Sequence, residues 1–142
     1  MPKSTSFRSD ILKAVLQAVF TNLTNIIANG ASPITDIYLS LHTADPSGGD
    51  QSTSEVSYTG YARKAVLRTA AGWSVSGNVA TPLADVVFGT CTAGSATATH
   101  VGIGKSISGV GYLFWSGTLS PNIAIASTVI PTIPAGSTIT ET

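Results

Sequence analysis

One segment of the chain brings together side chains that could bind a metal ion. It holds an imidazole and three carboxylates: His42, Asp45, Asp50 and Glu55. Carboxylate oxygens are the ligands that Ca²⁺ prefers, and imidazole nitrogens together with carboxylates can bind Zn²⁺. The spacing is neither that of an EF-hand loop nor that of a paired-histidine zinc motif. We therefore expect an ordinary solvated loop with no metal or other cofactor, and keep weak calcium binding as the reserve hypothesis.

A glycine-rich run, GIGKS from Gly102 to Ser106, resembles the end of a phosphate-binding loop. In such a loop the backbone N–H groups and a Lys bind phosphate, and a hydroxyl holds magnesium. Here the first glycine of the motif would fall at Thr99, and no helical pattern follows Ser106. The run is better interpreted as a strand end and a turn. The sequence also has no nucleophile elbow and no evident pair of catalytic carboxylates, so it does not predict an enzyme.

The local group of aromatic and basic residues consists of Tyr58, Tyr61, Arg63, Lys64 and Arg68. On a strand, Tyr61 and Arg63 would share one face, whereas Lys64 and Arg68 would share the other. This dispersal argues against nucleic-acid binding, which needs clustered cations. Tyr and Arg are favoured contact residues between proteins, so the pattern is compatible with Arg63 or Arg68 pairing with acidic groups of a protein partner.

The element that positions these side chains is a strand predicted over residues 35–43, with one apolar and one solvated face. The apolar face would carry Ile37, Leu39 and Leu41, and the solvated face Tyr38, Ser40 and His42. The segment 43–59 that follows contains Pro46 and two glycines, which favour a loop. We expect this loop to be mobile in the free protein and to become ordered only against a partner, so that shortening it between Ser47 and Ser54 would leave folding nearly intact.

An amphipathic helix is predicted near the N-terminus, within residues 6–28. Its apolar stripe would contain Phe7, Ile11, Leu12, Val15, Leu16 and Val19. Ser6 is the predicted N-cap, Asp10 is placed in the first turn, and the helix could extend toward Ile27. The apolar stripe is expected to cover the sheet, with packing on a neighbouring subunit as the alternative.

The rest of the chain shows short β-like runs separated by turn residues. Strands are predicted near 35–43, 61–69, 72–76, 78–80, 84–89, 97–104, 111–117, 122–129 and 137–141, with a tight turn at Gly77-Asn78 and a sheet edge or bend around Ile133. The predicted fold is mainly β: one domain over 1–142, a jelly-roll-like antiparallel β-sandwich (34–142) with one N-terminal amphipathic α-helix. The expected core residues are Trp73, Phe88, Ile103, Phe114, Trp115, Ile123, Ile125 and Ile139.

The run Tyr112–Trp115 consists entirely of apolar or aromatic residues, so two of its side chains must point to each face of a strand. Either both faces are covered or one pair meets a partner. Charged residues make up only 10% of the chain, and seven Lys+Arg balance seven Asp+Glu. Such a surface gives little electrostatic repulsion between copies, which favours a homodimer or homotrimer. Neither a signal peptide nor a membrane span is expected.

Four segments together resemble a known family: YLSLHTADPSGG, SEVSYTGYARKAV, HVGIGKSISGVGYLFWSGTLS and IPAGSTIT. The sequence is similar to small structural proteins of tailed bacteriophages, which are often labelled tail fibre proteins. The resemblance covers nearly the whole chain and implies a virion protein made in the host cytoplasm.

The predicted function is that of a non-enzymatic capsid cement, or decoration, protein that binds the outside of the major capsid protein shell. The alternative is a tail fibre or baseplate component that contacts the host surface. No nucleic-acid or membrane partner is expected. The candidate partner-contact residues are Asp45, Asp50, Glu55, Tyr58, Tyr61, Arg63, Tyr112 and Trp115.

Overall fold

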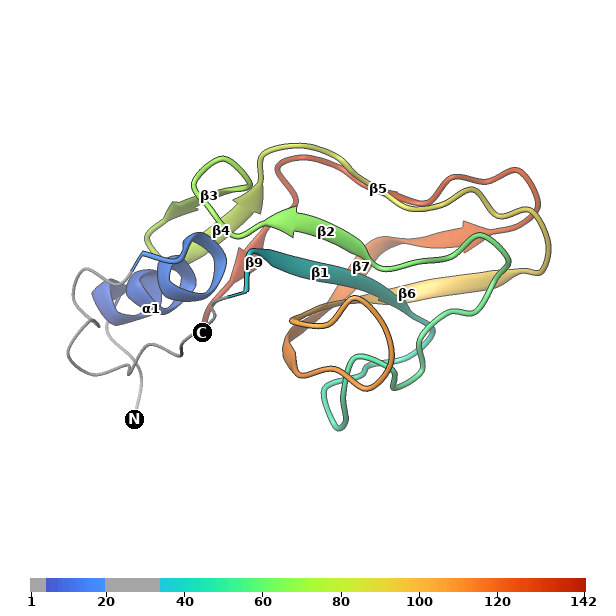
Figure 1. The fold of residues 1–142 in the computed structure, drawn as a ribbon, viewed down its shortest axis with the longest axis horizontal. Helices are drawn as coiled ribbons and strands as arrows, with labels where there is room; N and C mark the ends of the chain where they lie inside the picture. The colour runs from blue at the N-terminus through green and yellow to red at the C-terminus, as the bar shows by residue number, and fades with distance from the viewer. Residues whose placement is uncertain (1–4, 20–33) are drawn as a thin grey trace. The chain divides into compact units, whose positions relative to one another are not determined.

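A computed structural model describes residues 5–19 and 34–142 and shows a mainly β protein with one short N-terminal helix (Figure 1). Its strands are β1 (Asp36–His42), β2 (Lys64–Leu67), β3 (Trp73–Ser76), β4 (Val79–Pro82), β5 (Val86–Val87), β6 (Ala96–Gly104), β7 (Leu113–Ile125), β8 (Thr132–Ile133) and β9 (Ile139–Thr140). The helical segment consists of α1 (Thr5–Leu12) followed by one π-helical stretch, η1 (Lys13–Gln17). The predicted β class with an N-terminal helix is therefore confirmed.

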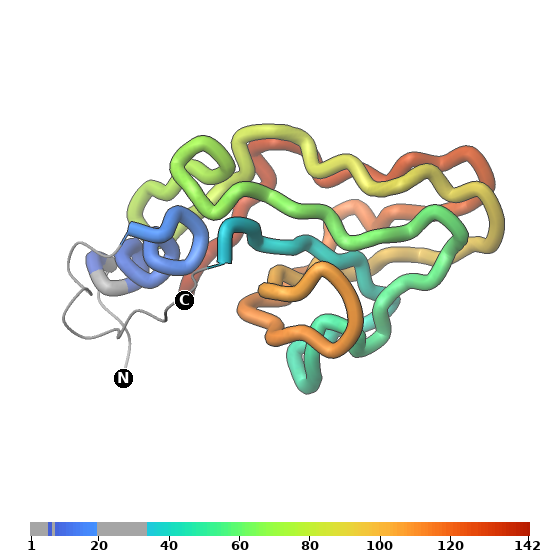
Figure 2. The backbone as a smooth tube through the Cα atoms, viewed as in Figure 1, coloured from blue at the N-terminus to red at the C-terminus, as the bar shows by residue number. Residues whose placement is uncertain are grey.

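The chain divides into two compact units, each built from segments that are distant in sequence. Unit 1 comprises residues 1–36, 66–85 and 134–142, and unit 2 comprises residues 37–65 and 86–133. The backbone trace in Figure 2 can be followed through both. The sequence placed a boundary only between the helix region and the β region, whereas the helix belongs to the same unit as β3, β4 and β9. The prediction of a single domain remains a prediction.

The helical segment of unit 1 buries Leu12, Ala14 and Leu16. Leu12 and Leu16 stand four residues apart and thus lie on one side of the helix. The described helix spans Thr5–Leu12, so Ser6 lies inside it and is not the N-cap, and no acidic residue occupies its first turn. The segment ends at Ala18, whose left-handed backbone (φ 56°) stops regular helix. The predicted extension toward Ile27 falls outside the described residues.

Hydrogen bonds from Arg68 connect the end of this helical segment to the rest of unit 1. Its Nε donates to the carbonyl oxygen of Val15 and its NH2 to that of Ala14, both at 2.6 Å. The Arg68 backbone N–H also donates to the Thr35 carbonyl at 2.9 Å. Carbonyls in the last turn of a helix lack partners within the helix, so Arg68 satisfies two of them. Burial lowers the pKa of Arg68.

The sheet of unit 1 has the order β3-β4-β9. The predicted turn at Gly77-Asn78 joins β3 to β4, and Gly77 has a positive φ of 61°. Trp73 is 1% exposed, as predicted for a core residue, and its carbonyl accepts a hydrogen bond from Gln17 Nε2 at 2.9 Å. The sheet and the helical segment are thus bonded to each other within this unit.

The main sheet has the order β2-β1-β6-β7, and β1 pairs antiparallel with β6 (Figure 1). Because β1 has a strand on either side, it is a central strand. Ile37, Leu39 and Leu41 are buried as predicted, but Ser40 and His42 are also fully buried. The prediction that they form a solvated face was wrong, because the segment after β1 folds back and bonds to His42.

Strand β7 is one long strand where the sequence predicted two, over 111–117 and 122–129. Its pairing with β6 shifts part-way: Ala98 is opposite Ile123, but His100 is opposite Thr118. Residues 119–122 of β7 therefore face only Thr99. This irregular section contains Pro121, a residue that marks a break in the sequence pattern.

A two-stranded sheet of β5 and β8 completes unit 2 and places the region around Ile133 at an edge, as predicted. The described strands form sheets of four, three and two strands, so the jelly-roll topology is not confirmed. Trp73, Phe88, Ile103 and Ile125 are buried, as predicted. Phe114, Trp115, Ile123 and Ile139 are only partly buried.

Candidate functional site: two loops on a buried polar network

Two connections of unit 2 are joined by a network of polar side chains. Loop A (residues 43–63) follows β1, and loop B (residues 105–112) connects β6 to β7. The backbone N–H of Gln51 in loop A donates to the carbonyl of Gly111 in loop B at 3.0 Å. Gln51, although polar, is fully buried. The two loops therefore form a single structure rather than two independent connections.

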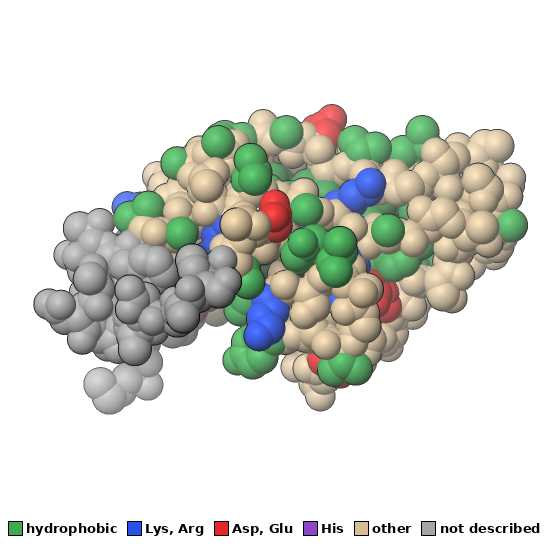
Figure 3. Space-filling model, in the orientation of Figure 1, with side chains coloured by type: hydrophobic (Ala, Val, Ile, Leu, Met, Phe, Trp, Pro, Cys, Tyr) green, Lys and Arg blue, Asp and Glu red, His purple; other side chains and the backbone are tan. Residues whose placement is uncertain are grey.

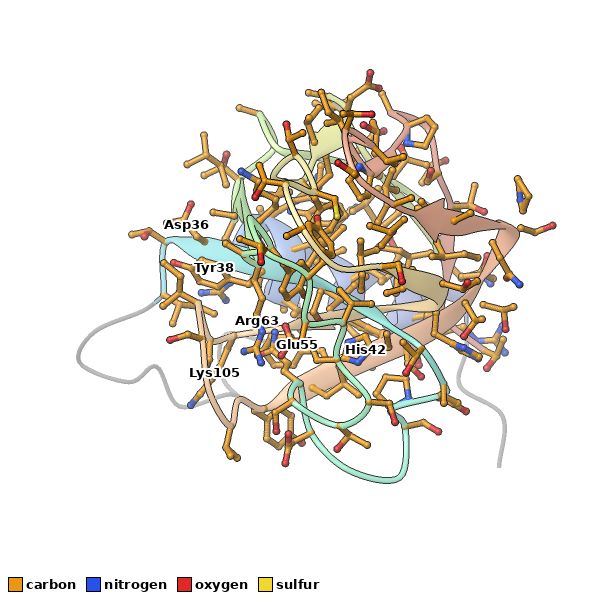
Figure 4. All side chains as sticks on the ribbon, turned by 90° about the vertical axis from the view of Figure 1, so that its right-hand side faces the viewer. Asp36, Tyr38, His42, Glu55, Arg63 and Lys105 are labelled. Carbon is orange, nitrogen blue, oxygen red and sulfur yellow. The ribbon has the colours of Figure 1, made fainter. Side chains whose placement is uncertain are left out.

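The centre of the network is a two-pronged ion pair between Arg63 and Glu55 (Figure 4). Arg63 Nε donates to Glu55 Oε1 and NH2 donates to Oε2, both at 2.7 Å. The same guanidinium also bonds loop B, with NH1 donating to the Ser106 carbonyl at 3.0 Å and NH2 to the Gly109 carbonyl at 2.7 Å. The hydrogen bonds from Arg63 to Glu55 raise the pKa of Arg63. The planar guanidinium of Arg63 donates four hydrogen bonds to a carboxylate and two backbone carbonyls, whereas a Lys ammonium has only three N–H donors.

Tyr61 extends this network to β1. Its hydroxyl donates to Glu55 Oε1 at 2.7 Å and accepts the backbone N–H of Leu41 at 3.1 Å. Burial and the hydrogen bond to Glu55 raise the pKa of Tyr61, so the phenol stays protonated. Its ring stacks on Phe88, with centroids 6.2 Å apart, and meets Tyr58 edge-on at 5.4 Å. Tyr58 in turn donates to the Gly89 carbonyl at 2.8 Å.

His42 and Ser40 form a buried hydrogen-bonded pair that resembles part of a catalytic triad. His42 Nε2 lies 2.8 Å from Ser40 Oγ, and Nδ1 lies 2.8 Å from the Thr53 carbonyl. Because a carbonyl only accepts, Nδ1 carries a proton; burial lowers the pKa of His42, so Nε2 accepts from the serine hydroxyl. Both side chains are fully buried, and a Cβ at Gly102 would come within 2.5 Å of Nε2. A substrate could not reach this pair, which instead fastens loop A to β1.

The glycines that resemble a phosphate-binding motif have a different role. Gln51 Oε1 accepts the backbone N–H of Ser106 at 2.9 Å, which bends the chain after β6. Atoms of the Gln51 side chain stand where a Cβ would lie at Gly104 and at Gly111. Gln51 fills this space at position 104, and Gln51 together with Ser106 fills it at position 111, so both positions suit glycine. The interpretation of the run as a strand end and a turn is confirmed, since β6 ends at Gly104.

Asp45 and Asp50 are exposed or partly exposed, and each accepts two hydrogen bonds from a serine of its own loop. Asp45 accepts the backbone N–H and hydroxyl of Ser47, both at 2.9 Å, and the hydroxyl of Ser116 on β7 at 3.0 Å. Asp50 accepts the N–H of Ser52 at 2.7 Å and its hydroxyl at 2.6 Å. These hydrogen bonds lower the pKa of each carboxyl group, with Ser47 as the main cause for Asp45 and Ser52 for Asp50.

The carboxylates of loop A do not converge on a common point. Glu55 binds Arg63, whereas Asp45 and Asp50 bond to different serines. Among the described residues, no three His, Cys, Asp or Glu side chains are close enough together to hold a metal ion. The reserve hypothesis of calcium binding therefore gains no support from this geometry.

The structure separates the candidate contact residues into an interior and an exposed set. Tyr58 and Arg63 are buried, and Trp115 is partly buried. Glu55 and Tyr61 are also partly buried; Glu55 accepts hydrogen bonds from both Tyr61 and Arg63. The predicted mobility of the segment 43–59 in the free protein remains a prediction, although Pro46, Gln51, Val56 and Tyr58 of this segment are buried. The sequence analysis missed Gln51; the only signal for it was the pair of glycines at 104 and 111.

Loop B carries exposed apolar side chains, among them Tyr112, which the sequence placed in the neighbouring predicted strand. Val110 is 80% exposed, Tyr112 is 67% exposed and Ile107 is 65% exposed, more than any other large apolar side chain described. The ring of Tyr112 contacts Phe114 with centroids 5.6 Å apart, and Phe114 contacts Trp115 at 6.0 Å. Of the run Tyr112–Trp115, only Tyr112 is strongly exposed.

The chain from residue 8 to residue 141 matches the family model described as Podophage GP4 fiber I protein gp80. The chain belongs to this family. It is therefore a phage structural protein, of a fibre family whose members are generally not enzymes. Among curated proteins, none matches the chain. In the part of the chain that the structure describes, no helix is both long and apolar enough to span a membrane.

Proposed function

We propose that this protein is a non-enzymatic component of a phage fibre that acts by binding other proteins of the virion. The observation that carries this proposal is the family match, which extends from residue 8 to residue 141 and thus includes both loops. The polar residues that resemble catalytic or metal sites support it, because they are used internally: Ser40 and His42 are buried, and Glu55 is held by Arg63.

The binding surface in this proposal is the exposed side of loops A and B. Arg63, Glu55 and Gln51 hold the backbone from beneath, while Val110, Tyr112 and Asp45 point their side chains to solvent. A binding loop that is ordered before it meets its partner loses less conformational entropy on binding. Of the predicted contact residues, Asp45, Asp50 and Tyr112 remain in the proposal as direct contacts, and Arg63 and Glu55 enter it as residues that position the loops.

The capsid cement role predicted from the sequence is the competing proposal, with the major capsid protein as its partner. The low content of charged residues suits both roles, since either one requires a large contact surface between proteins. The family description favours the fibre.

Location on the particle distinguishes the two roles. Purified virions would be separated into heads and tails, and antibody labelling and quantitative mass spectrometry would count the copies of this chain in each fraction. The fibre proposal expects the chain in the tail fraction at a copy number that is a small multiple of the tail symmetry. Copies in the hundreds on heads would overturn it in favour of cement, and absence from both fractions would overturn both roles.

A further inference from the structure

We infer that the outer edge of β7 binds an extended segment of a different protein, which adds to the main sheet as a further strand. This edge is separate from the exposed side of loops A and B, and the inference does not depend on where in the virion the chain resides. β7 lies at the end of the order β2-β1-β6-β7, so in the described sheets no strand pairs with its outer side. An uncovered strand edge is a template on which another extended chain can pair.

The strand register shows which backbone groups of β7 point outward. In β1, the N–H of Leu41 donates to the Tyr61 hydroxyl and its carbonyl accepts the N–H of Val56, so neither group faces β6. Leu41 is opposite Val101, and residues of an antiparallel strand alternate between bonding one neighbour and pointing away from it. The backbone groups of Val101 therefore face β7, where the opposite residue is Gly117.

The residues on either side of Gly117 consequently direct their backbone groups outward. Ser116 and Thr118 are opposite Gly102 and His100, with no register shift between them. Each has one N–H and one C=O, so an added strand can form two hydrogen-bonded pairs with them. Apart from strand pairing, no backbone–backbone hydrogen bond among the described residues involves either residue. The register shifts on both sides limit this regular stretch, so the site accepts one short segment.

Asp45 indicates the charge of the segment that fits this edge. The Ser116 hydroxyl donates to Asp45 Oδ1 at 3.0 Å, which places an exposed carboxylate beside the edge. A residue opposite Ser116 on the added strand has its side chain on the same face, with the two Cβ atoms about 4.5–5.5 Å apart. A Lys or Arg at that position can therefore reach the carboxylate. Charged side chains are few and scattered on the face shown in Figure 3, so a single carboxylate can distinguish this edge.

The same carboxylate disfavours a second copy of β7 as the occupant. In a two-fold antiparallel pairing centred on Ser116, the Asp45 side chains of both copies would lie beside the same pair of residues. Like charges placed opposite each other destabilise strand pairing. The segment that fits has a cation opposite Ser116 instead.

The neighbouring side chains extend the specificity of the site. Thr118 is exposed and favours a Thr in the opposite position. Beyond Ser116, the rings of Phe114 and Tyr112 are in contact, and Tyr112 is 67% exposed, so an apolar side chain of the partner can pack there. For an antiparallel segment, the orientation that is more stable per residue, the expected order is Thr, any residue, Lys or Arg, any residue, then Val or Ile.

The test combines the purified protein with a synthetic peptide whose central order is Thr-Ser-Lys-Ser-Ile. Amide hydrogen exchange followed by NMR resolves single residues of β7. In the free protein the amide of Gly117 should exchange slowly and those of Ser116 and Thr118 quickly, because only Gly117 bonds to β6. Saturating peptide should slow exchange at Ser116 and Thr118 at least about tenfold and leave Gly117 unchanged. Absence of binding up to about 1 mM peptide, or bound peptide that leaves both amides unprotected, would overturn the inference.

Methylation of the peptide backbone separates strand pairing from attraction between charges. N-methyl groups on the Thr and Lys of the peptide remove the donors directed at β7 but keep both side chains, and should abolish the protection. N-methyl groups on its two Ser residues, whose N–H groups point away from β7, are the matched control and should leave binding nearly intact. Equal binding of the two methylated peptides contradicts strand addition.

Two charge reversals in loop A test the role of Asp45. Asp45→Lys should raise the dissociation constant of the peptide at least about fivefold, and a peptide with Glu in place of Lys should then bind better. Asp50→Lys makes the same charge change, but this carboxylate bonds to Ser52 and not to β7, so binding should change much less. Thermal melting verifies that both variants are folded. Equal effects of the two reversals would reject Asp45 as the specific contact, and protection of Ser116 and Thr118 on concentrating the protein without peptide would assign the edge to a second copy.

Discussion

The side chain of Gln51 occupies the space in which a Cβ would stand at Gly104. A residue in the middle of a loop is thereby linked to a residue at the end of a central β-strand. Since the nearest atoms to such a Cβ all belong to Gln51, a methyl group at position 104 can be accommodated only if Gln51 moves.

We expect Gly104→Ala to lower the free energy of unfolding by about 1–3 kcal/mol, because it overpacks this contact. Urea unfolding followed by fluorescence measures the change. Gly48→Ala is the control, since a Cβ at Gly48 would meet nothing within 4 Å. The variant Gln51→Ala is also expected to destabilise the protein through lost hydrogen bonds, but the double variant should be less damaged than the sum of the two. Simple additivity would show that the two residues do not share this space.

Glu55→Gln should lower the free energy of unfolding by about 3 kcal/mol, because it leaves the buried Arg63 guanidinium without its counter-charge. Asp36→Asn removes the same charge from a side chain whose hydrogen bond to Thr35 is exposed, and its effect should stay within about 0.5 kcal/mol. Amide hydrogen exchange in Glu55→Gln should become faster in loop B, which Arg63 holds. Equal effects of the two substitutions would mean that the buried ion pair has no special role in stability.

The stability of the protein should fall as the pH is lowered below about 6.5, because of His42. Burial lowers the pKa of His42 from its ordinary value of 6.5. Between pH 6.5 and the lower pKa of His42 in the folded protein, the unfolded chain binds a proton that the folded chain does not. Lowering the pH through this range therefore favours unfolding. Urea midpoints measured between pH 7.5 and pH 5 should decrease in the wild type and in His100→Gln, but much less in His42→Gln. A wild-type midpoint that is constant over this range would contradict the prediction.

A second loss of stability should follow at lower pH from Asp45 and Asp50. Hydrogen bonds from Ser47 and Ser52 lower their pKa values from 3.8, so their contribution is present above that value and disappears as the pH falls through the folded pKa values. The double variant Asp45→Asn, Asp50→Asn should lose this acidic step in the urea midpoint and keep the step due to His42. If the double variant loses both decreases in the urea midpoint, the decrease at higher pH does not come from His42 alone.

Arg68→Gln should destabilise unit 1 by about 1–3 kcal/mol, because the carbonyls of Ala14 and Val15 lose their charged donor. Lys64→Gln removes a positive charge from β2, the strand that ends just before Arg68, and serves as the control. Hydrogen exchange should accelerate at residues 13–19 in the Arg68 variant and stay unchanged in loop B. If exchange accelerated only in loop B, Arg68 would not be the residue that stabilises the helical segment.

The strands were predictable where the pattern is local. The alternation around Leu39 located β1, and the Gly77-Asn78 turn located the β3–β4 hairpin. The length of β7 was not predictable from the sequence. Pro121 indicates the end of a strand, but here it lies inside a strand whose pairing is irregular. The N-cap at Ser6 was misplaced because helix boundaries depend on the first-turn contacts as well as on residue type.

The polar network was harder to predict than the strands because its members are distant in sequence. His42 and Ser40 alternate with apolar residues, so the sequence pattern predicts that they are exposed to solvent. In the structure they are buried, because loop A covers them. Gln51 is surrounded by polar neighbours and resembles any loop residue. Only the pairing of loops A and B explains why a glutamine is buried there, and such long-range contacts leave no periodic signal in sequence.

The irregular pairing of β7 also limits how the protein can polymerise. A regular outer strand offers an unbroken row of N–H and C=O groups on which further chains can stack without limit. In β7 this row is interrupted at residues 119–122, where Pro121 has no N–H to offer. We expect this interruption to disfavour the growth of amyloid-like ribbons along β7.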